Sequence, residues 1–301
     1  MWFKQLFVYR LPSDFKLTPA QLEAKLAARP LTPLSAYERQ RCGWLPPAPE
    51  ALGRALVHST QQHHLLALGV EQKLLPVSVV RQAAAERAAE FESSQGYPVG
   101  RKQLRDIKEM VADELLQRAF SQRRTTLCWV DTTNKRLLID ATSPPRAEEL
   151  LSTLRDTLDT FNAPLLATEQ APRYAMTTWL ANGDAPRYFN IDEDLELRSA
   201  NNTKVCVRYI HHALDGKEIK AHLKAGMNVT RLGLTWRDRV SFVLTDELQL
   251  KRIQFVGLGQ DNAGAESGSD AERFENDFAL TTGELSLLLN DLTAALGGEA
   301  Q

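Results

Sequence analysis

Long apolar segments are missing from this sequence. The longest run, around residues 65–70, is far shorter than the ~20 residues that a membrane-spanning helix requires. The segment Met1–Gln5 has no basic stretch followed by an apolar one, so we expect no secretory signal. Cysteine is scarce, and its three copies (Cys42, Cys128 and Cys206) are far apart. This argues against a disulfide framework and favours a reducing compartment, so we expect a cytoplasmic protein that does not contact membranes.

The short motifs that mark common catalytic and cofactor sites are also missing. The sequence contains no glycine-rich dinucleotide or phosphate-binding fingerprint, no C-x-x-C, no H-E-x-x-H and no G-x-S-x-G. Two adjacent histidine pairs occur, His63-His64 and His211-His212. Neighbouring residues on a strand point to opposite faces, so neither pair favours a shared metal site. We therefore expect no enzymatic activity, no cofactor and no bound metal.

Charge is plentiful and nearly balanced, but it is unevenly distributed. The 301 residues include 36 Lys+Arg and 38 Asp+Glu, for a net charge of -2. Residues 1–146 contain 21 Lys+Arg and 14 Asp+Glu, for a net charge of +7. Residues 147–201 contain 4 Lys+Arg and 10 Asp+Glu, for a net charge of -6. Residues 202–256 contain 10 Lys+Arg and 5 Asp+Glu, for a net charge of +5. Residues 257–301 contain 1 Lys+Arg and 9 Asp+Glu, for a net charge of -8. Such bands either form one basic and one acidic surface or are merely solvated, so the total does not exclude a nucleic-acid partner.

The order of predicted elements indicates an α+β fold. Two long helices, over 76–94 and 101–120, are separated by the break at Gly96–Gly100 and form a helical hairpin inserted between strands. We expect mixed antiparallel sheets with flanking helices and this protruding hairpin. The expected domains are 1–75 plus 119–165, the inserted hairpin 76–118, and a second α+β domain over 166–301. The second domain includes a three-stranded meander over 229–256.

Four local features are predicted from turn and cap signals. Residues 64–70 and 72–75 are expected to form a β-hairpin with Gly69 near its turn. The acidic run at 192–194 is expected at the start of a helix. Thr282 is predicted to cap a final helix over 284–296, and the Gly/Ser/Asp-rich segment 257–270 is predicted to be a mobile loop.

Basic residues gather on the helical hairpin, on the strand after it and again over 204–224. Arg101, Arg105 and Lys108 are spaced i, i+4 and i+7, which places them on one stripe of a helix. Such a stripe binds phosphates through charge and needs no base contacts. The alternative is that the acidic residues within 106–114 pair with it. The candidate DNA-binding residues are Lys73, Arg81, Arg101, Lys102, Arg105, Lys108, Arg118, Arg123, Arg124, Lys204, Arg208, Lys217, Lys220 and Lys224.

Six segments carry a common signal from the first residue to the last. They are MWFKQLFVYRL (1–11), GWLPP (43–47), LPVSVVRQ (75–82), RAFS (118–121), VTRLGLTWRDRVSFVLTDELQLKRIQF (229–255) and TGELSLLLNDLTAALGGE (282–299), and the short stretches WVD (129–131) and LLID (137–140) carry the signal as well. Together they resemble the RdgC family of recombination-associated proteins. The resemblance implies a horseshoe-shaped protomer that forms a ring-shaped homodimer around duplex DNA, without sequence preference. It also implies binding of single-stranded DNA, nucleoid association, restraint of RecA-promoted strand exchange, and no enzymatic activity.

The resemblance also implies two subunit contacts. Phe120, in the RAFS motif, is the expected interface anchor, and the alternative is a core residue that closes its helix. His211 and His212 fall near the other expected contact. If the basic bands are only solvated, the runner-up is a cytoplasmic protein-interaction scaffold that acts through its acidic C-terminal region and does not bind DNA.

Overall fold

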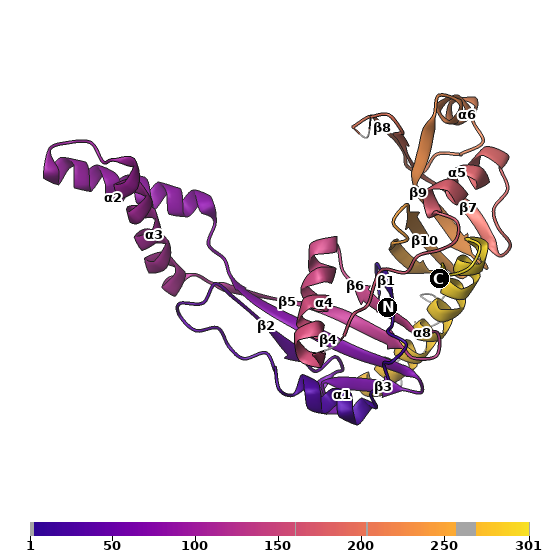
Figure 1. Cartoon of the computed structure of the whole chain (residues 1–301), viewed down its shortest axis with the longest axis horizontal. Helices are drawn as coiled ribbons and strands as arrows, with labels where there is room; N and C mark the ends of the chain where they lie inside the picture. Colours follow the sequence, from indigo (N-terminus) through magenta and orange to yellow (C-terminus); the bar gives the residue numbers. More distant parts are fainter. Residues whose placement is uncertain (1–2, 160, 203, 257–268, 301) are drawn as a thin grey trace.

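Two antiparallel sheets with helices around them confirm the predicted α+β class (Figure 1). The computed structural model describes residues 3–159, 161–202, 204–256 and 269–300. Of the segment 257–270 that was expected to be a loop, residues 257–268 lie outside the described residues. The predicted three-stranded meander is confirmed by the consecutive strands β9, β10 and β11, whose bounds follow below.

The first sheet has six strands in the order β1-β6-β5-β4-β2, and β3 also pairs with β4. One face packs against helices α1 and α4, where Leu66 and Ile139 of the sheet share a core with Leu22 and Leu150 of the helices. The elements are β1 (Phe7–Arg10), α1 (Pro19–Leu26), β2 (Gln40–Leu45), the 3-10 helix η1 (Glu50–Leu52), β3 (Val57–Thr60), β4 (His63–Lys73), β5 (Ser121–Asp131), β6 (Arg136–Asp140) and α4 (Pro144–Leu158).

The second sheet has five strands in the order β11-β10-β9-β7-β8. Alternation along β9 buries Leu232, Leu234 and Trp236 on one face, which packs against helices, and leaves the intervening residues on the other face. The elements are α5 (Pro172–Asn182), β7 (Phe189–Ser199), β8 (Cys206–Tyr209), α6 (Lys217–Lys224), β9 (Met227–Trp236), β10 (Val240–Thr245), β11 (Leu250–Phe255) and α8 (Asp270–Ala295).

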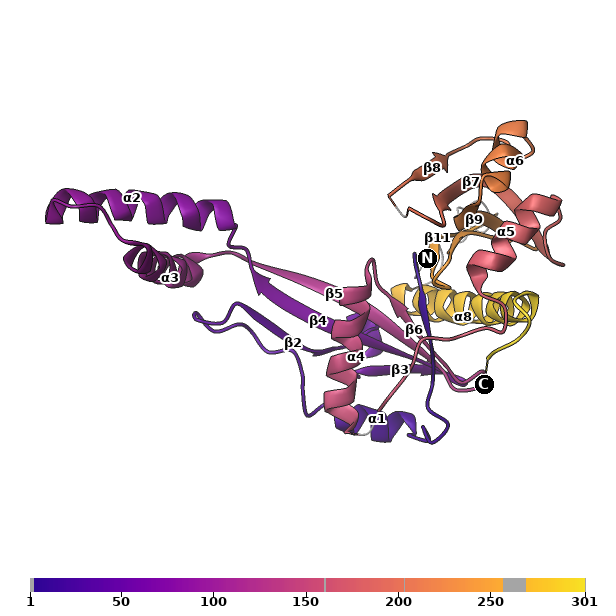
Figure 2. The ribbon, with the colours of Figure 1, turned by 45° about the horizontal axis from the view of Figure 1, so that its top comes forward.

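A single hydrophobic core joins the two sheets. It combines Trp129 of the first sheet with Trp236 of the second and with Phe278 of α8, all of them fully buried. The backbone continues this connection, because Leu6 and Leu250 exchange N–H···O hydrogen bonds of 2.8 and 3.0 Å. The N-terminal segment therefore pairs with both sheets, and α8 lies beside both (Figure 2).

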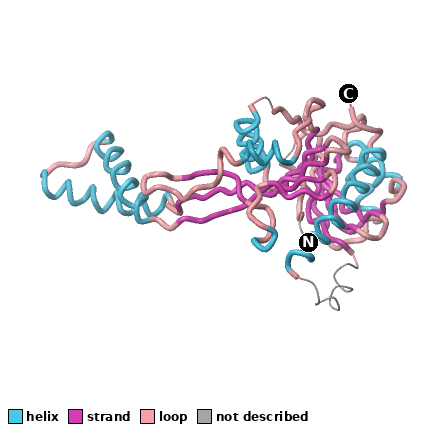
Figure 3. Tube along the Cα trace, turned by 90° about the horizontal axis from the view of Figure 1, so that it is seen from below, coloured by secondary structure: helices cyan, strands magenta, loops and turns pink. Residues whose placement is uncertain are grey.

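Strands β4 and β5 extend beyond this core and carry the helical hairpin. They pair over eleven residues each, from His63 opposite Asp131 to Lys73 opposite Ser121. Their outer ends lead into α2 (Val77–Gln95) and α3 (Arg101–Arg118), which have a small core of their own. The hairpin lies at one end of the molecule and the second sheet at the other (Figure 1), and Figure 3 shows the extended strands between them. The prediction of a protruding helical hairpin is confirmed.

The predicted β-hairpin over 64–75 is wrong. Residues 64–73 belong to the continuous strand β4, which pairs with β3 across the turn at Gln61 and Gln62, and Leu74 and Leu75 follow the strand. Gly69 lies in mid-strand opposite Gly43, and the side chain of Leu45 covers it, so that a Cβ at Gly69 would lie 2.4 Å from Leu45 Cδ1. Glycine here serves close packing and not a turn.

Two predicted helix starts are also wrong. The run Asp192–Asp194 lies inside β7, at a register irregularity between Ile191 and Leu195, so the acidic residues sit in an interrupted strand. The final helix begins at Asp270, where Ser269 forms a capping box with Glu272. Thr282 is buried within that helix, and its hydroxyl donates a hydrogen bond of 2.8 Å to the Phe278 carbonyl. The hydroxyl is thus satisfied inside the helix and does not cap a helix end.

Gly43 is expected to be intolerant of any side chain. A Cβ there would lie 2.5 Å from the backbone nitrogen of Leu31, which flexible side chains cannot relieve. We predict that Gly43→Ala lowers the free energy of unfolding by ~1–3 kcal/mol in urea denaturation. Gly283→Ala is the matched control, because its Cβ meets no atom within 4 Å and alanine favours α8 by up to ~1 kcal/mol. Equal effects of the two substitutions would contradict the packing argument.

Asp140 is expected to make stability fall with rising pH. Burial raises the pKa of Asp140 to about 6, although the Gln5 N–H donates to its Oδ1 at 3.3 Å. The folded state then holds a proton that the unfolded state releases near pH ~4, so stability falls between pH ~4 and 6. We predict that Asp140→Asn raises the free energy of unfolding at pH 8 by ~1–2 kcal/mol and flattens this window.

The control for Asp140 is Asp156→Asn, which removes a surface carboxylate that lies 3.3 Å from Arg29. Exposed pairs of this kind contribute ~0–1 kcal/mol, so the control should leave the pH dependence over the same window unchanged. A pH profile of Asp140→Asn that superimposes on the wild-type profile would show that folding does not change the pKa of Asp140, which contradicts the prediction.

Candidate nucleic-acid interface

The α3 stripe, meaning Arg101, Lys102, Arg105 and Lys108, is exposed along its length. Ile107 and Val111 of the same helix are buried against α2, which turns the stripe toward solvent. Arg105 Nε donates to Glu109 Oε1 at 3.0 Å, and this hydrogen bond raises the pKa of Arg105. Among the described residues, no carboxylate pairs with the other three members within 4.0 Å. The predicted intrahelical pairing thus affects one of the four cations.

The hairpin as a whole carries no net charge. Residues 76–118 contain seven Lys+Arg and seven Asp+Glu. One cation has a structural role, because Arg87 of α2 contacts Glu114 of α3 at 3.3 Å and Glu90 at 3.6 Å. Arg81 and Arg118 are exposed. Attraction of phosphates to the hairpin therefore depends on where its cations lie and not on its total charge.

Arg123 and Arg124 are bound by carboxylates on opposite faces of β5. Arg123 Nη2 lies 3.0 Å from Glu71 of β4, and hydrogen bonds from Arg123 and Ser121 lower the pKa of Glu71. Arg124 Nη1 lies 2.7 Å from Glu149 of α4. The neighbouring Lys73 Nζ donates to the Ala119 carbonyl at 3.4 Å. Lys73 thus contacts the base of the hairpin, Arg123 links β5 to β4, and Arg124 links β5 to α4, while the contact of all three with DNA stays a prediction.

The second basic cluster lies at the other end of the molecule. Lys217, Lys220 and Lys224 are exposed on α6, which is anchored by the buried Ile219, and Lys204 is exposed before β8. Arg208 of β8 is instead hydrogen-bonded to Glu196 of β7. Figure 1 places β8 and α6 at the opposite end from α2 and α3. One protomer does not bring the two clusters together.

Sequence reasoning missed a third group of cations on the open face of the second sheet. Arg231 of β9, Lys251 and Arg252 of β11, and Lys4 line one pocket there. The signal was present in β9, where Arg231 precedes the alternating buried residues Leu232 and Leu234. The common face of these residues depends on the order β11-β10-β9, which the sequence alone does not provide.

Phe120 is exposed, and the alternative that it closes a core is wrong. Its side chain is 85% exposed at the base of the hairpin, where its carbonyl accepts the Leu74 N–H at 2.7 Å. Leu74 is 50% and Val77 72% exposed. We call Leu74, Val77 and Phe120 the hairpin-base patch. Three apolar side chains in water favour burial against a partner.

The histidine pairs differ from each other in setting. His63 and His64 lie on β4, and burial lowers the pKa of both, with Asp131 opposing this at His63. His211 and His212 follow β8 in an exposed loop and are not on a strand as expected, because His211 has a φ of 51° and leaves the extended conformation. Ile210 beside them is 53% exposed.

The described ranges 3–159, 161–202, 204–256 and 269–300 contain no group of three or more His, Cys, Asp or Glu side chains arranged to hold a metal ion. Of the helices that the structure describes, none is long and apolar enough to cross a membrane.

Comparisons with known proteins agree on one family. The family model described as "Putative exonuclease, RdgC" matches residues 1–299. A protein of Janthinobacterium sp. is 43% identical over 301 residues, which cover 100% of this chain and 99% of the relative. A protein of Dechloromonas aromatica is 45% identical over 302 residues, with 99% and 98% covered. One of Burkholderia ambifaria is 44% identical over 299 residues, with 99% and 97% covered.

The two kinds of description differ in what they say. The family model's description names an exonuclease, whereas each of these three relatives is called "Recombination-associated protein RdgC". Both carry the same family name, and the matches extend over nearly the full length of every chain compared. The similarity expected from the six sequence segments is therefore confirmed, and this chain belongs to the RdgC family.

Proposed function

We propose that this protein binds DNA without sequence preference and restrains recombination. The observation that carries the proposal is the match over residues 1–299 to a family whose members are named as recombination-associated. Recombination acts on DNA, and exposed cations without carboxylate partners are the side chains that bind its phosphates. The α3 stripe supplies such cations at one end of the chain, and Lys217, Lys220 and Lys224 supply them at the other.

The two basic ends act together if two copies form a ring. In this proposal each protomer is a horseshoe, and two of them meet hairpin end to hairpin end and β8 end to β8 end. A two-fold axis through both contacts makes each of them self-complementary. The exposed hairpin-base patch supports the first contact, and exposed Ile210 beside His211 and His212 supports the second. The ring would enclose duplex DNA, and single strands would bind the same cations.

Enclosure explains how such a protein would oppose strand exchange. A ring that encloses duplex DNA through phosphate contacts moves along the DNA but does not release it readily. RecA and its filament therefore cannot bind the DNA segment that the ring covers. We propose that the protein acts in this way in the cytoplasm, on the nucleoid, and without catalysing a reaction. The alternative, a protein-interaction scaffold that uses the acidic C-terminal region, requires no cation on α3.

The α3 stripe is the part of this proposal that is most directly testable. We predict that the variant Arg101→Gln, Lys102→Gln, Lys108→Gln binds duplex DNA roughly tenfold or more weakly at low salt. The slope of log affinity against log salt should fall by about 0.9 for each phosphate that the variant no longer neutralises. A salt titration by fluorescence anisotropy on linear and covalently closed duplexes measures both quantities.

Arg87→Gln is the matched control for the α3 stripe. It removes one positive charge from the same hairpin, but from a side chain that already contacts Glu114 and Glu90. It should lower the stability of the hairpin and leave the salt slope unchanged. If the triple variant keeps the wild-type slope, the α3 stripe does not bind DNA and the scaffold alternative gains support.

Phe120 tests the dimer separately from DNA binding. We predict that Phe120→Ser raises the dimer dissociation constant by ~10-fold or more, because a large aromatic ring at an interface commonly contributes ~2 kcal/mol or more. Sedimentation equilibrium measures this constant. Tyr37→Ser is the control, since Tyr37 is also exposed (74%) but lies in the loop before β2. An unchanged dissociation constant for Phe120→Ser would place the subunit contact elsewhere.

A further inference from the structure

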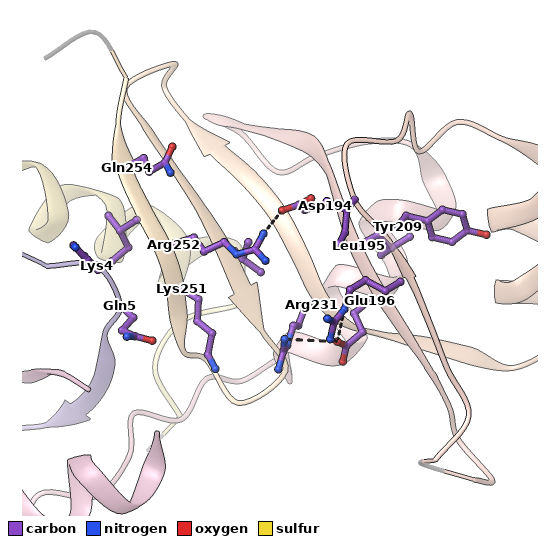
Figure 4. A pocket seen from close by; sticks show the side chains of 14 residues that line it. Lys4, Gln5, Asp194, Leu195, Glu196, Tyr209, Arg231, Lys251, Arg252 and Gln254 are labelled. Atoms are coloured by element: carbon purple, nitrogen blue, oxygen red, sulfur yellow. Dashed lines mark hydrogen bonds and ion pairs between the residues drawn. The ribbon is translucent and has the colours of Figure 1, made fainter. Parts of the chain in front are cut away.

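The open face of the second sheet is hollowed where it meets the N-terminal segment. Lys4 and Gln5 form one wall, and β7, β8, β9, β10 and β11 supply the rest of a pocket of about 560 Å³ (Figure 4). Its lining joins charged side chains to apolar ones, among them Val243 and Ile210. A volume of this size suits a small organic ligand.

Of the two carboxylates that line this pocket, Asp194 and Glu196, the second is already fully engaged. Glu196, with 3% of its side chain exposed, accepts hydrogen bonds from Arg208 Nε at 3.2 Å, Arg198 Nε at 3.0 Å and Thr230 Oγ1 at 3.1 Å. Arg231 Nη1 lies a further 3.6 Å from it. Burial would raise the pKa of Glu196, but these arginines lower it to about 2. The single negative charge of Glu196 is therefore shared by three arginines and does not balance any other cation of the pocket.

The two lysines in the pocket have no direct carboxylate partner among the described residues. Of the lining residues, Lys4, Arg208, Arg231, Lys251 and Arg252 are basic, against Asp194 and Glu196. Asp194 is occupied by Arg252 at 2.7 Å. Within the described part of the chain, neither Lys4 nor Lys251 has a carboxylate within 4.0 Å of its Nζ. Burial, and next the charge of Arg231, lower the pKa of Lys251. The pocket therefore holds the half-buried positive charges of Lys251 and Arg231, which an anion would stabilise, and the exposed Lys4 lies at its edge.

We propose that this pocket binds a nucleoside phosphate, with the phosphate between Lys251 and Arg231 and the nucleoside against Val243 and Ile210. The apolar side chains and the volume distinguish this ligand from a bare phosphate ion. The site is separate from the α3 stripe, and its ligand is one nucleotide, not a length of duplex. The same chemistry is offered by a free nucleotide and by the phosphorylated end of a DNA strand.

Isothermal titration of the full-length protein with deoxyadenosine 5′-monophosphate at low ionic strength tests this assignment. We expect one molecule bound per protomer, and a loss of affinity on the order of tenfold in Lys251→Gln, which removes one charged hydrogen-bond donor. Lys220→Gln is the matched control, because it removes an exposed lysine of α6 that does not line the pocket. Thermal unfolding of each variant verifies that the fold is retained.

Two further probes identify the source of the nucleotide. A short single strand with a 5′-phosphate, compared with the same strand ending in a 5′-hydroxyl, should show a Lys251-dependent preference if the pocket takes strand ends. Equal binding of the two strands, with Lys251-dependent binding of the mononucleotide, supports a free nucleotide instead. The proposal is overturned if the mononucleotide does not bind, if Lys251→Gln binds it as wild type does, or if inorganic phosphate binds as tightly.

Failure here is distinguishable from failure of the proposed DNA binding. The triple variant of the α3 stripe should bind the mononucleotide with wild-type affinity, whatever its affinity for duplex DNA. If the protein binds duplex DNA through α3 but binds no mononucleotide, the proposed DNA binding stands and the proposed nucleoside phosphate site is disproved.

Discussion

The position of every basic cluster depends on the core that joins the two sheets. Trp129, Trp236 and Phe278 are buried together there, and the hydrogen bonds between Leu6 and Leu250 tie the N-terminal segment to β11. Without this junction the two sheets would be separate units, and the distance between the hairpin and α6 would be undefined. Because the junction is apolar and continuous, the chain can hold cations at both ends of an elongated molecule in a fixed relation.

Ion pairing decides which of the many cations are available to a ligand. Arg123, Arg124 and Arg208 form ion pairs with carboxylates of neighbouring elements, so their charge mainly stabilises contacts within the fold. Lys102 and Lys251 are positively charged as well, but no carboxylate of the described residues forms an ion pair with either one. A charge count over the sequence treats all five as equal. The availability of a cation is a property of its neighbours in space.

Much of the fold could be predicted from local patterns, and the failures have specific causes. The helical hairpin followed from two long predicted helices on either side of the break at Gly96–Gly100, and its position between strands is as expected. The prediction at Gly69 is wrong because a glycine in a sequence signals a turn as readily as it signals close packing against Leu45. The prediction at Thr282 is wrong because its hydroxyl bonds within the helix. The cations on the open face of the second sheet could not be predicted, because their grouping depends on β9 and β11 lying on either side of β10.

The length of the β4–β5 pair has a consequence for how this family can change. Each residue adds ~3.3 Å to a strand, so the eleven pairs carry the hairpin some tens of ångströms along their direction. One residue inserted in each strand on the core side of Arg124 would turn Arg124 to the face away from Glu149 of α4, whereas Glu71 and Arg123, which are directly opposite each other, would change face together. Two residues inserted in each strand keep every side chain beyond them on its original face and displace the hairpin by ~7 Å. Paired insertions or deletions of even length therefore change the span between the two ends without exchanging the faces of the strand pair.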